Sequence, residues 1–386
     1  MPTSICLWSV VNKAVERGHH CRIISKFGTV YNSLTDLYPK DSKDFGSIKS
    51  KTKIYSFFEQ LYTYRTWPYC LSVDSTELYN KVRQEISIKQ PDLLVCSVGS
   101  VNSLVVGCRL KNEYNDLFYY VPCFFDALLS GPPMKYMSKR EHDLRAIIAE
   151  NRLLKNADSI VMMKAAEIKH TLYKDKLTFT NNIKYLDIPL YNPKEEQVAD
   201  FRTFFPEGQK ILFFAGSMPR NIRNPSFFLR LFGKMKEANI HLYIAGRSDY
   251  IREIKTLAQY DKRIHLLGIL PHEQIQRMYR EADYLVNIGN NVEGMIPSKI
   301  FEYMSFGKPI VSTYRIKNDP CVEYLKCYGR AVLINEKESS SIGYEKMIKF
   351  LNDNSSLDKD FTIRHSEKLY NNTPDAFVQL FESLRK

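Results

Sequence analysis

The feature that most constrains the fold of this chain is a regular alternation of short apolar runs with helix-like stretches. In the second half, four of these apolar runs end in glycine, at Gly216, Gly246, Gly268 and Gly289. Glycine is expected where a strand turns sharply into a loop at the carboxyl edge of a parallel sheet. The alternation therefore predicts an α/β fold, with parallel strands joined by crossover helices.

Length and one break in the pattern predict two domains. A chain of 386 residues is longer than one hydrophobic core usually serves. The run from Pro189 to Pro193 interrupts the alternation and predicts a hinge. We expect a Rossmann-like domain over residues 1–190 and a second over residues 191–370. A C-terminal helix within residues 371–386 would pack back on the first domain. Both domains would be doubly wound and would face a common cleft, where the carboxyl ends of their strands bind ligands.

The N-terminus departs from this pattern. A helix-like stretch begins at about Ser4 and leads through Arg17 and Gly18 to a strand candidate at residues 21–24. In a doubly wound domain a strand normally precedes such a helix. We therefore expect the first strand of the N-terminal domain to be missing. A start site placed too late, a truncation and a genuine deletion are all open explanations.

Charge and cysteine usage narrow the class of partner. The net charge of +12 favours acidic partners, such as nucleotide phosphates or anionic lipid. No zinc-finger spacing, RNP-type aromatic motif or arginine-rich tail accompanies it, so we expect no nucleic-acid partner. The eight cysteines form no CxxC pair, which predicts reduced thiols and a cytoplasmic protein. No signal peptide is evident, and no apolar run approaches the ~20 residues that span a bilayer.

Residues 49–69 interleave lysines with tyrosine, phenylalanine and tryptophan. Two interpretations are open. The segment is an amphipathic helix whose aromatic side chains lie in the core, or it seats the protein peripherally on an anionic membrane.

The most informative stretch runs from Gly289 to Val311 and predicts strand, loop, helix and strand. Pro297 and Ser298 are suited to start the helix, and Gly307 is suited to end it. A helix N-terminus behind a loop offers free N–H groups to an anion.

Three side chains of this stretch could take part in binding. Lys299 adds a positive charge at the helix start, and Glu302, one turn on, is placed to accept hydrogen bonds from ribose hydroxyls. Glu293, in the loop, could reach sugar hydroxyls. The alternative is that Glu302 is a surface residue and Ser298 only a helix cap.

A second patch follows the strand that ends at Gly216. Asn224 and Pro225 predict a helix start, so Arg223 would stand just before a helix N-terminus, at the same sheet edge as the first patch. The alternative is a solvated arginine.

The stretch from Glu293 to Pro309 resembles the signature of the retaining GT-B glycosyltransferases, especially family 4. Its segment Pro-Ser-Lys-Ile-Phe-Glu-Tyr-Met is similar to that of bacterial surface-polysaccharide enzymes. The resemblance implies that Glu302 binds the nucleotide ribose and that Glu293, Gly294 and Met295 meet the donor sugar. Here eight residues separate the two glutamates, whereas the family pattern has seven.

The resemblance also assigns the donor diphosphate to the loop after the strand that ends at Gly216. Ser217 stands where the family usually has an arginine, so that role would fall to Arg223, or less favourably to Arg220. Gly216, Ser217, Ser298 and Lys299 complete the implied donor site, with Arg223 and Glu293 as catalytic residues.

The family's chemistry implies a UDP- or GDP-linked sugar as donor, no metal and no cofactor. In the first domain, Asp126 either contacts sugar or acceptor or caps a turn. We expect a sugar transferase that retains configuration, acts on a glycan or polyprenyl-linked acceptor and serves surface polysaccharide synthesis. The alternatives are a catalytically inactive partner protein of the same fold and a nucleotide-sugar epimerase.

Overall fold

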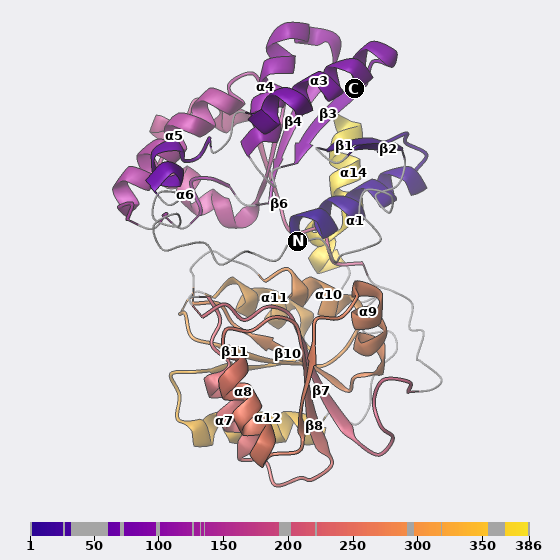
Figure 1. The fold of residues 1–386 in the computed structure, drawn as a ribbon, viewed down its shortest axis with the longest axis vertical. Coiled ribbons are helices and arrows are strands. Elements are labelled where there is room, and N and C mark those ends of the chain that lie inside the picture. Colours follow the sequence, from indigo (N-terminus) through magenta and orange to yellow (C-terminus); the bar gives the residue numbers. More distant parts are fainter. Residues whose placement is uncertain are drawn as a thin grey trace. The chain divides into compact units, whose positions relative to one another are not determined.

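A computed structural model describes most of the chain, and Figure 1 shows its ribbon. The described residues are 2–25, 28–31, 61–69, 73–97, 101–125, 127–131, 133–134, 136–192, 202–220, 222–291, 297–317, 319–353 and 367–384. The chain divides into two compact units. The first contains Met1–Pro189 and Asn371–Lys386, and the second contains Leu190–Tyr370. Each unit has a parallel sheet with helices, which confirms the predicted α/β class.

The first unit is built on a four-stranded parallel sheet in the order β3-β4-β5-β6. Its strands are β3 (Leu93–Ser97), β4 (Tyr119–Phe124), β5 (Ile160–Met163) and β6 (Ile183–Leu186). The helices of this part of the chain are α3 (Val73–Ile88), α4 (Val101–Tyr114), α5 (Lys139–Leu154) and α6 (Glu167–Leu172). The helices α4, α5 and α6 each follow one strand and precede the next, so they are the expected crossovers.

Both faces of this sheet are covered, as the continuous apolar runs of its strands require. Along β4, Tyr120 and Phe124 enter a core cluster that also holds residues of α3, α4 and α5. The alternate residues Val121 and Cys123 enter a second cluster on the other face. There the sheet packs against α1 (Pro2–Glu16) and α14 (Pro374–Ser383), with Phe377 fully buried.

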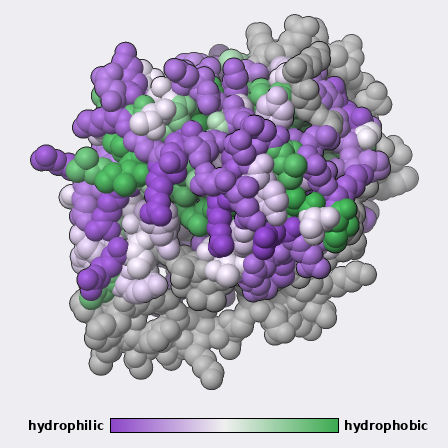
Figure 2. Space-filling view, turned by 90° about the horizontal axis from the view of Figure 1, so that it is seen from above, coloured by the Kyte–Doolittle hydropathy of each residue, from purple (hydrophilic) through white to green (hydrophobic). Residues whose placement is uncertain are grey.

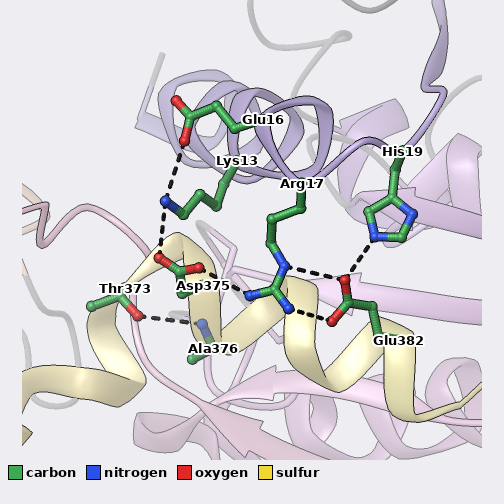
Figure 3. A network of polar contacts seen from close by, with 8 residues as sticks. All are labelled: Lys13, Glu16, Arg17, His19, Thr373, Asp375, Ala376 and Glu382. Atoms are coloured by element: carbon green, nitrogen blue, oxygen red, sulfur yellow. Dashed lines mark hydrogen bonds and ion pairs between the residues drawn. The ribbon is translucent and has the colours of Figure 1, made fainter.

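Charged side chains join α1 to α14 beside that second core (Figure 3). Arg17 makes a two-pronged contact with Glu382, at 3.1 Å from Nε and 2.7 Å from Nη2, and its Nη1 lies 3.3 Å from Asp375. His19 Nε2 lies 2.8 Å from the same Glu382 carboxylate. Hydrogen bonds from His19 and Arg17 hold the pKa of Glu382 below its usual value. The C-terminal helix is therefore fixed to the first unit by apolar packing and by ion pairs.

The N-terminal strand pairs differently from our expectation. The predicted strand forms as β1 (Arg22–Ser25), but it pairs antiparallel with β2 (Gly28–Tyr31) in a separate two-stranded sheet. The expectation of a parallel strand here was wrong. The hydrogen-bonding edge of β1 is taken by the segment that follows it along the chain, since Arg22 lies opposite Tyr31 and Ser25 opposite Gly28. Arg22 Nη1 also donates to the carbonyl oxygen of Glu85 at the end of α3, at 2.5 Å.

The second unit has a six-stranded parallel sheet in the order β12-β11-β10-β7-β8-β9. Its strands are β7 (Lys210–Ala215), β8 (Ile240–Ala245), β9 (Ile264–Gly268), β10 (Tyr284–Ile288), β11 (Ile310–Tyr314) and β12 (Ala331–Asn335). Its helices are α7 (Ser226–Gly233), α8 (Ile251–Tyr260), α9 (His272–Glu281), α10 (Lys299–Ser305), α11 (Pro320–Tyr328) and α12 (Ser340–Asp353). The chain winds outward from β7 to β9, then returns to β10 and winds outward the other way. This reversal confirms the doubly wound topology predicted for the second half.

Among the described helices, none is both long enough and apolar enough to cross a membrane.

Candidate functional site

The site is placed by the point at which the strand order of the second sheet reverses. β7 and β10 are neighbours there, with Leu212 opposite Tyr284 and Phe213 opposite Leu285. Loops that leave two such strands diverge to opposite faces of the sheet and open a crevice at its carboxyl edge, where doubly wound folds bind ligands. β7 leads into the segment around Arg223, and β10 leads into the segment before Glu302. The strand order therefore places the start of the segment that carries Arg223 and the start of the segment before Glu302 at the same edge of the sheet.

Glycines allow the backbone segments at this edge to approach closely. A Cβ atom on Gly246 would lie 2.0 Å from the carbonyl oxygen of Gly216, and one on Gly289 would lie 2.7 Å from that of Thr313. Gly246 also has a φ of +120°, which side-chain-bearing residues rarely adopt. The glycines that follow β8 and β10 are therefore needed for packing between neighbouring loops.

Arg223 ties the loop after β7 to the end of β10. Its Nη1 donates to the carbonyl oxygen of Ser217 at 2.9 Å, and its Nη2 donates to Asn290 Oδ1 at 3.0 Å. The backbone supports the link, because the N–H of Asn291 donates to the carbonyl oxygen of Ile222 at 2.6 Å. Burial lowers the pKa of Arg223, yet a guanidinium stays charged at neutral pH. The positive charge is thus held in one orientation.

Arg220, in the same loop, is held elsewhere. Its Nη2 lies 2.8 Å from Glu253 on α8, and its side chain is 57% exposed. Its backbone N–H donates to Asp249 Oδ2 at 2.9 Å. Arg220 is therefore engaged with α8, whereas Arg223 is engaged with the end of β10.

A buried carboxylate, Asp319, lies beside Arg223 in this site, and it is not among the residues predicted from the sequence. Asp319 Oδ1 accepts the N–H of Cys321 at 2.9 Å and caps α11, and the residue is 4% exposed. Burial raises the pKa of Asp319, while the nearby charge of Arg223 opposes that rise. In the described structure, Asp319 Oδ2 and Arg223 Nε are both buried without a hydrogen-bond partner. Buried polar atoms are usually hydrogen-bonded, and these two lie at the predicted binding edge.

Two signals in the sequence could have pointed to the residues that were missed. Asp319 precedes Pro320, a combination that predicts a helix start after β11. The second signal is that Asn290 directly follows Gly289 at the end of a predicted strand. In the structure Asn290 is only 2% exposed.

Glu302 and Lys299 form an ion pair on α10. Lys299 Nζ lies 3.0 and 2.8 Å from the two carboxylate oxygens of Glu302. Glu302 is only 7% exposed, so it is not the surface residue that the alternative interpretation required. Ser298 stands at the start of α10, as predicted, but its side chain accepts no capping hydrogen bond, so the alternative in which it is only a helix cap was wrong. It lies in helical backbone conformation, one residue too far into the turn to cap it.

The helix α10 is anchored beneath the end of β7. The hydroxyl of Tyr303 donates to the carbonyl oxygen of Ala215 at 3.2 Å and lies 3.3 Å from its N–H. The ring of Tyr303 packs edge-on against Tyr279, with centroids 5.2 Å apart. Tyr303 is adjacent to Glu302 in the chain, so this anchor fixes the position of Glu302 relative to the loop that carries Arg223.

Four of the predicted site residues lie outside the described residues. They are Glu293, Gly294 and Met295 after β10, and Asp126 after β4. Their roles stay predictions from the sequence.

Known proteins share the fold described above. The sequence model of the family described as glycosyl transferases group 1 matches residues 209–353, which span most of the second unit. No protein with a curated description matches the chain in sequence.

Three solved structures show the extent of the likeness. Alr3699/HepE from Anabaena, in complex with UDP, has a TM-score of 0.56 at 15% identity, covering 80% of this chain and 81% of its own. WaaG, a glycosyltransferase involved in lipopolysaccharide biosynthesis, has a TM-score of 0.55 at 14% identity, covering 98% and 95%. Sucrose-phosphate synthase from Thermosynechococcus elongatus has a TM-score of 0.56 at 15% identity, covering 83% and 78%. The chain therefore has the GT-B fold, and its residues 209–353 match the sequence model of the glycosyl transferases group 1 family.

Proposed function

We propose that this chain is a glycosyltransferase that moves a sugar from a UDP- or GDP-linked donor to a glycan or polyprenyl-linked acceptor, with retention of configuration. The reaction would serve surface polysaccharide synthesis at the cytoplasmic side of a membrane. The observation that carries the proposal is the partly buried, oriented guanidinium of Arg223 at the reversal point of the sheet, held by Ser217 and Asn290.

The proposed roles follow from charge and position. A fixed cation at the carboxyl edge can bind the donor diphosphate and stabilise the charge that develops on it as it leaves. The backbone at Gly216 and Ser217 lies beside that cation and would border the phosphates. On the other side, Ser298 and Lys299 would approach the nucleotide, and Glu302 would accept hydrogen bonds from the ribose hydroxyls.

The reaction needs no nucleophile from the protein in this proposal. The bond between the sugar's anomeric carbon and the β-phosphate oxygen breaks, and the electron pair leaves with the nucleoside diphosphate. The acceptor hydroxyl oxygen bonds to the same face of that carbon, and its proton passes to the departing phosphate. Arg223 would stabilise the diphosphate throughout, so the step would proceed without a metal or a cofactor.

Similar proteins support the proposed function through the ligands that they bind or the pathway in which they act. The Anabaena protein was solved with UDP and also with UDP and glucose. WaaG is described as acting in lipopolysaccharide biosynthesis.

Calorimetric titration of the purified chain with UDP, GDP and their sugars tests the donor site. We expect one nucleotide to bind saturably, and Arg223→Ala to weaken that binding at least about tenfold, because it removes a charge-assisted contact. Arg220→Ala is the matched control, since it removes an arginine from the same loop that is paired with α8. Equal losses in both variants, or no nucleotide binding by the wild-type chain, would contradict the proposal.

Two further measurements test the chemistry once a donor and an acceptor are found. NMR of the product should show the anomeric configuration of the donor, and inversion would exclude the retaining mechanism. Transfer should persist in excess chelator, and a loss that a divalent cation restores would exclude metal independence.

A further inference from the structure

Four large aliphatic side chains are exposed on two neighbouring helices of the first unit. On α5, Leu144 is 45% and Ile148 is 66% exposed, and on α6, Ile168 is 79% and Leu172 is 73% exposed. Each pair is spaced four residues apart, so its members lie one above the other on their helix. Contacts within the described chain leave these side chains largely uncovered.

The two pairs border the same seam, which is the line along which α5 and α6 meet. α5 and α6 follow successive strands of one parallel sheet, so they lie on the same face and run in the same direction. Asp143 on α5 joins the helices, since its carboxylate accepts from Lys169 at 3.1 Å and from Tyr173 at 3.0 Å. Leu144 directly follows Asp143, and Ile168 directly precedes Lys169. With 100° of rotation per residue, both pairs fall on the outer side of this contact.

Further polar contacts join the two helices along this seam. Within it, His170 Nε2 lies 2.9 Å from Glu150, which also accepts the N–H of Leu129 at 3.0 Å. Lys169 donates to the carbonyl oxygen of the same Leu129 at 2.6 Å. The exposed aliphatic side chains thus lie on two helices that are joined to each other by polar contacts.

Exposed charged side chains in this part of the chain are mostly basic. Over residues 139–176, seven exposed side chains are basic and three are acidic, a surplus of four positive charges. Arg140 and Arg152 extend the row of Leu144 and Ile148 at the same four-residue spacing, one at each end. Figure 2 shows hydrophobic surface interrupted by hydrophilic side chains on the left of the view, the side on which α5 and α6 lie in Figure 1.

We propose that the outer face of α5 and α6 is a docking surface for an anionic lipid bilayer. Apolar side chains with basic neighbours match the boundary of such a membrane, where the aliphatic groups enter the acyl region and the arginines and lysines meet the headgroups. An exposed apolar patch bounded by polar residues marks an interaction site, and the positive surplus selects an anionic lipid surface as the partner. The inference adds a membrane partner to the proposed function, and it rests on the polyprenyl-linked acceptor of that function. Its test measures no transfer, so the two can fail separately.

Cosedimentation of the full chain with vesicles at low salt tests the docking surface. One set is phosphatidylcholine alone, and the other mixes phosphatidylcholine and phosphatidylglycerol in equal parts. We expect binding to the mixed vesicles that weakens with added salt, and much less binding to phosphatidylcholine. The double variant Ile148→Ser/Ile168→Ser should lower the partition coefficient by at least about tenfold, because two aliphatic side chains no longer enter the bilayer. The matched control is Ile88→Ser on α3, whose side chain is 68% exposed in the same unit.

Because the substituted side chains are exposed, all variants should melt as the wild type does and bind nucleotide equally. Failure of the wild-type chain to bind anionic vesicles would overturn the inference. So would a double variant that binds as the wild type, or an equal loss in Ile88→Ser. A wild-type dimer in solution that the double variant abolishes, without any vesicle binding, would assign the face to a second copy of the chain and overturn the lipid assignment.

Discussion

Replacing Glu302 should weaken nucleotide binding far more than it weakens folding. In the structure this carboxylate is 7% exposed and holds Lys299 at 2.8 Å. Under the proposed function it also receives the two ribose hydroxyls of the donor. Glu302→Gln keeps the size and one acceptor oxygen but removes the charge, whereas Glu302→Ala removes both. The two variants should therefore form a graded series.

The expected magnitudes separate the two roles. For folding, the Lys299 side chain is 26% exposed and can be rehydrated, so loss of the pair costs about 1 kcal/mol, between an exposed helix pair and a buried one. For binding, two hydrogen bonds to a charged acceptor contribute about 3 kcal/mol together. Glu302→Ala should then raise Kd on the order of 100-fold, and Glu302→Gln roughly tenfold.

Calorimetric titration with the preferred nucleotide measures Kd, and urea unfolding measures the free energy of unfolding of each variant. The matched control is Glu323→Ala, which breaks another Lys–Glu pair at the same three-residue spacing on α11, where Glu323 is 76% exposed. If Glu302→Ala bound nucleotide within about twofold of the wild type while folding normally, Glu302 would have no part in donor binding. An unfolding loss of about 4 kcal/mol would instead make it a structural residue.

Three further predictions concern the fold. Phe377→Ala should lower the free energy of unfolding by about 3–5 kcal/mol in urea titrations, because it empties a fully buried site beneath α14; a loss under about 1 kcal/mol would contradict the packing described. Gly246→Ala should destabilise by more than about 2 kcal/mol, since its Cβ would meet Gly216, and an unchanged melting temperature would refute that close approach. Burial lowers the pKa of both His241 and His265. The unfolded chain therefore gains protons first as pH falls through about 6.5, and stability should drop below that pH; in His265→Gln this dependence should be shallower, and an equal slope would count against it.

The fold of the second unit was predictable because its signals are local. The apolar runs around residues 210–216, 240–246, 264–268 and 284–289 appear as β7, β8, β9 and β10. Each run is short and bounded by a turn-forming glycine, so neighbouring residues suffice to define it. The helix before Gly307 was predictable for the same reason, since Pro297 and Gly307 bracket it in the chain.

What the sequence did not predict depends on partners distant in the chain. The run at residues 22–25 is apolar and extended in either case, but its pairing direction depends on which strand lies beside it, and that strand is β2. Likewise, nothing near Asp319 indicates that its carboxylate is buried beside Arg223, about a hundred residues away in the chain. A side chain's neighbours across a sheet edge follow from strand order, which one sequence does not state.

The two arginines of the loop after β7 show how strand order decides between candidates of equal chemistry. Arg220 and Arg223 are three residues apart and carry the same charge, so the loop sequence alone separates them weakly. The difference arises from the sheet, because β8 lies on one side of β7 and β10 on the other. Arg220 meets Glu253, which follows β8, and Arg223 meets Asn290, which follows β10. Since the strand order reverses between β7 and β10, the arginine bound on the β10 side is the one that lies at the ligand-binding crevice. A reversed outcome in the Arg223→Ala and Arg220→Ala titrations would therefore contradict the link between strand order and binding, and not merely one residue's role.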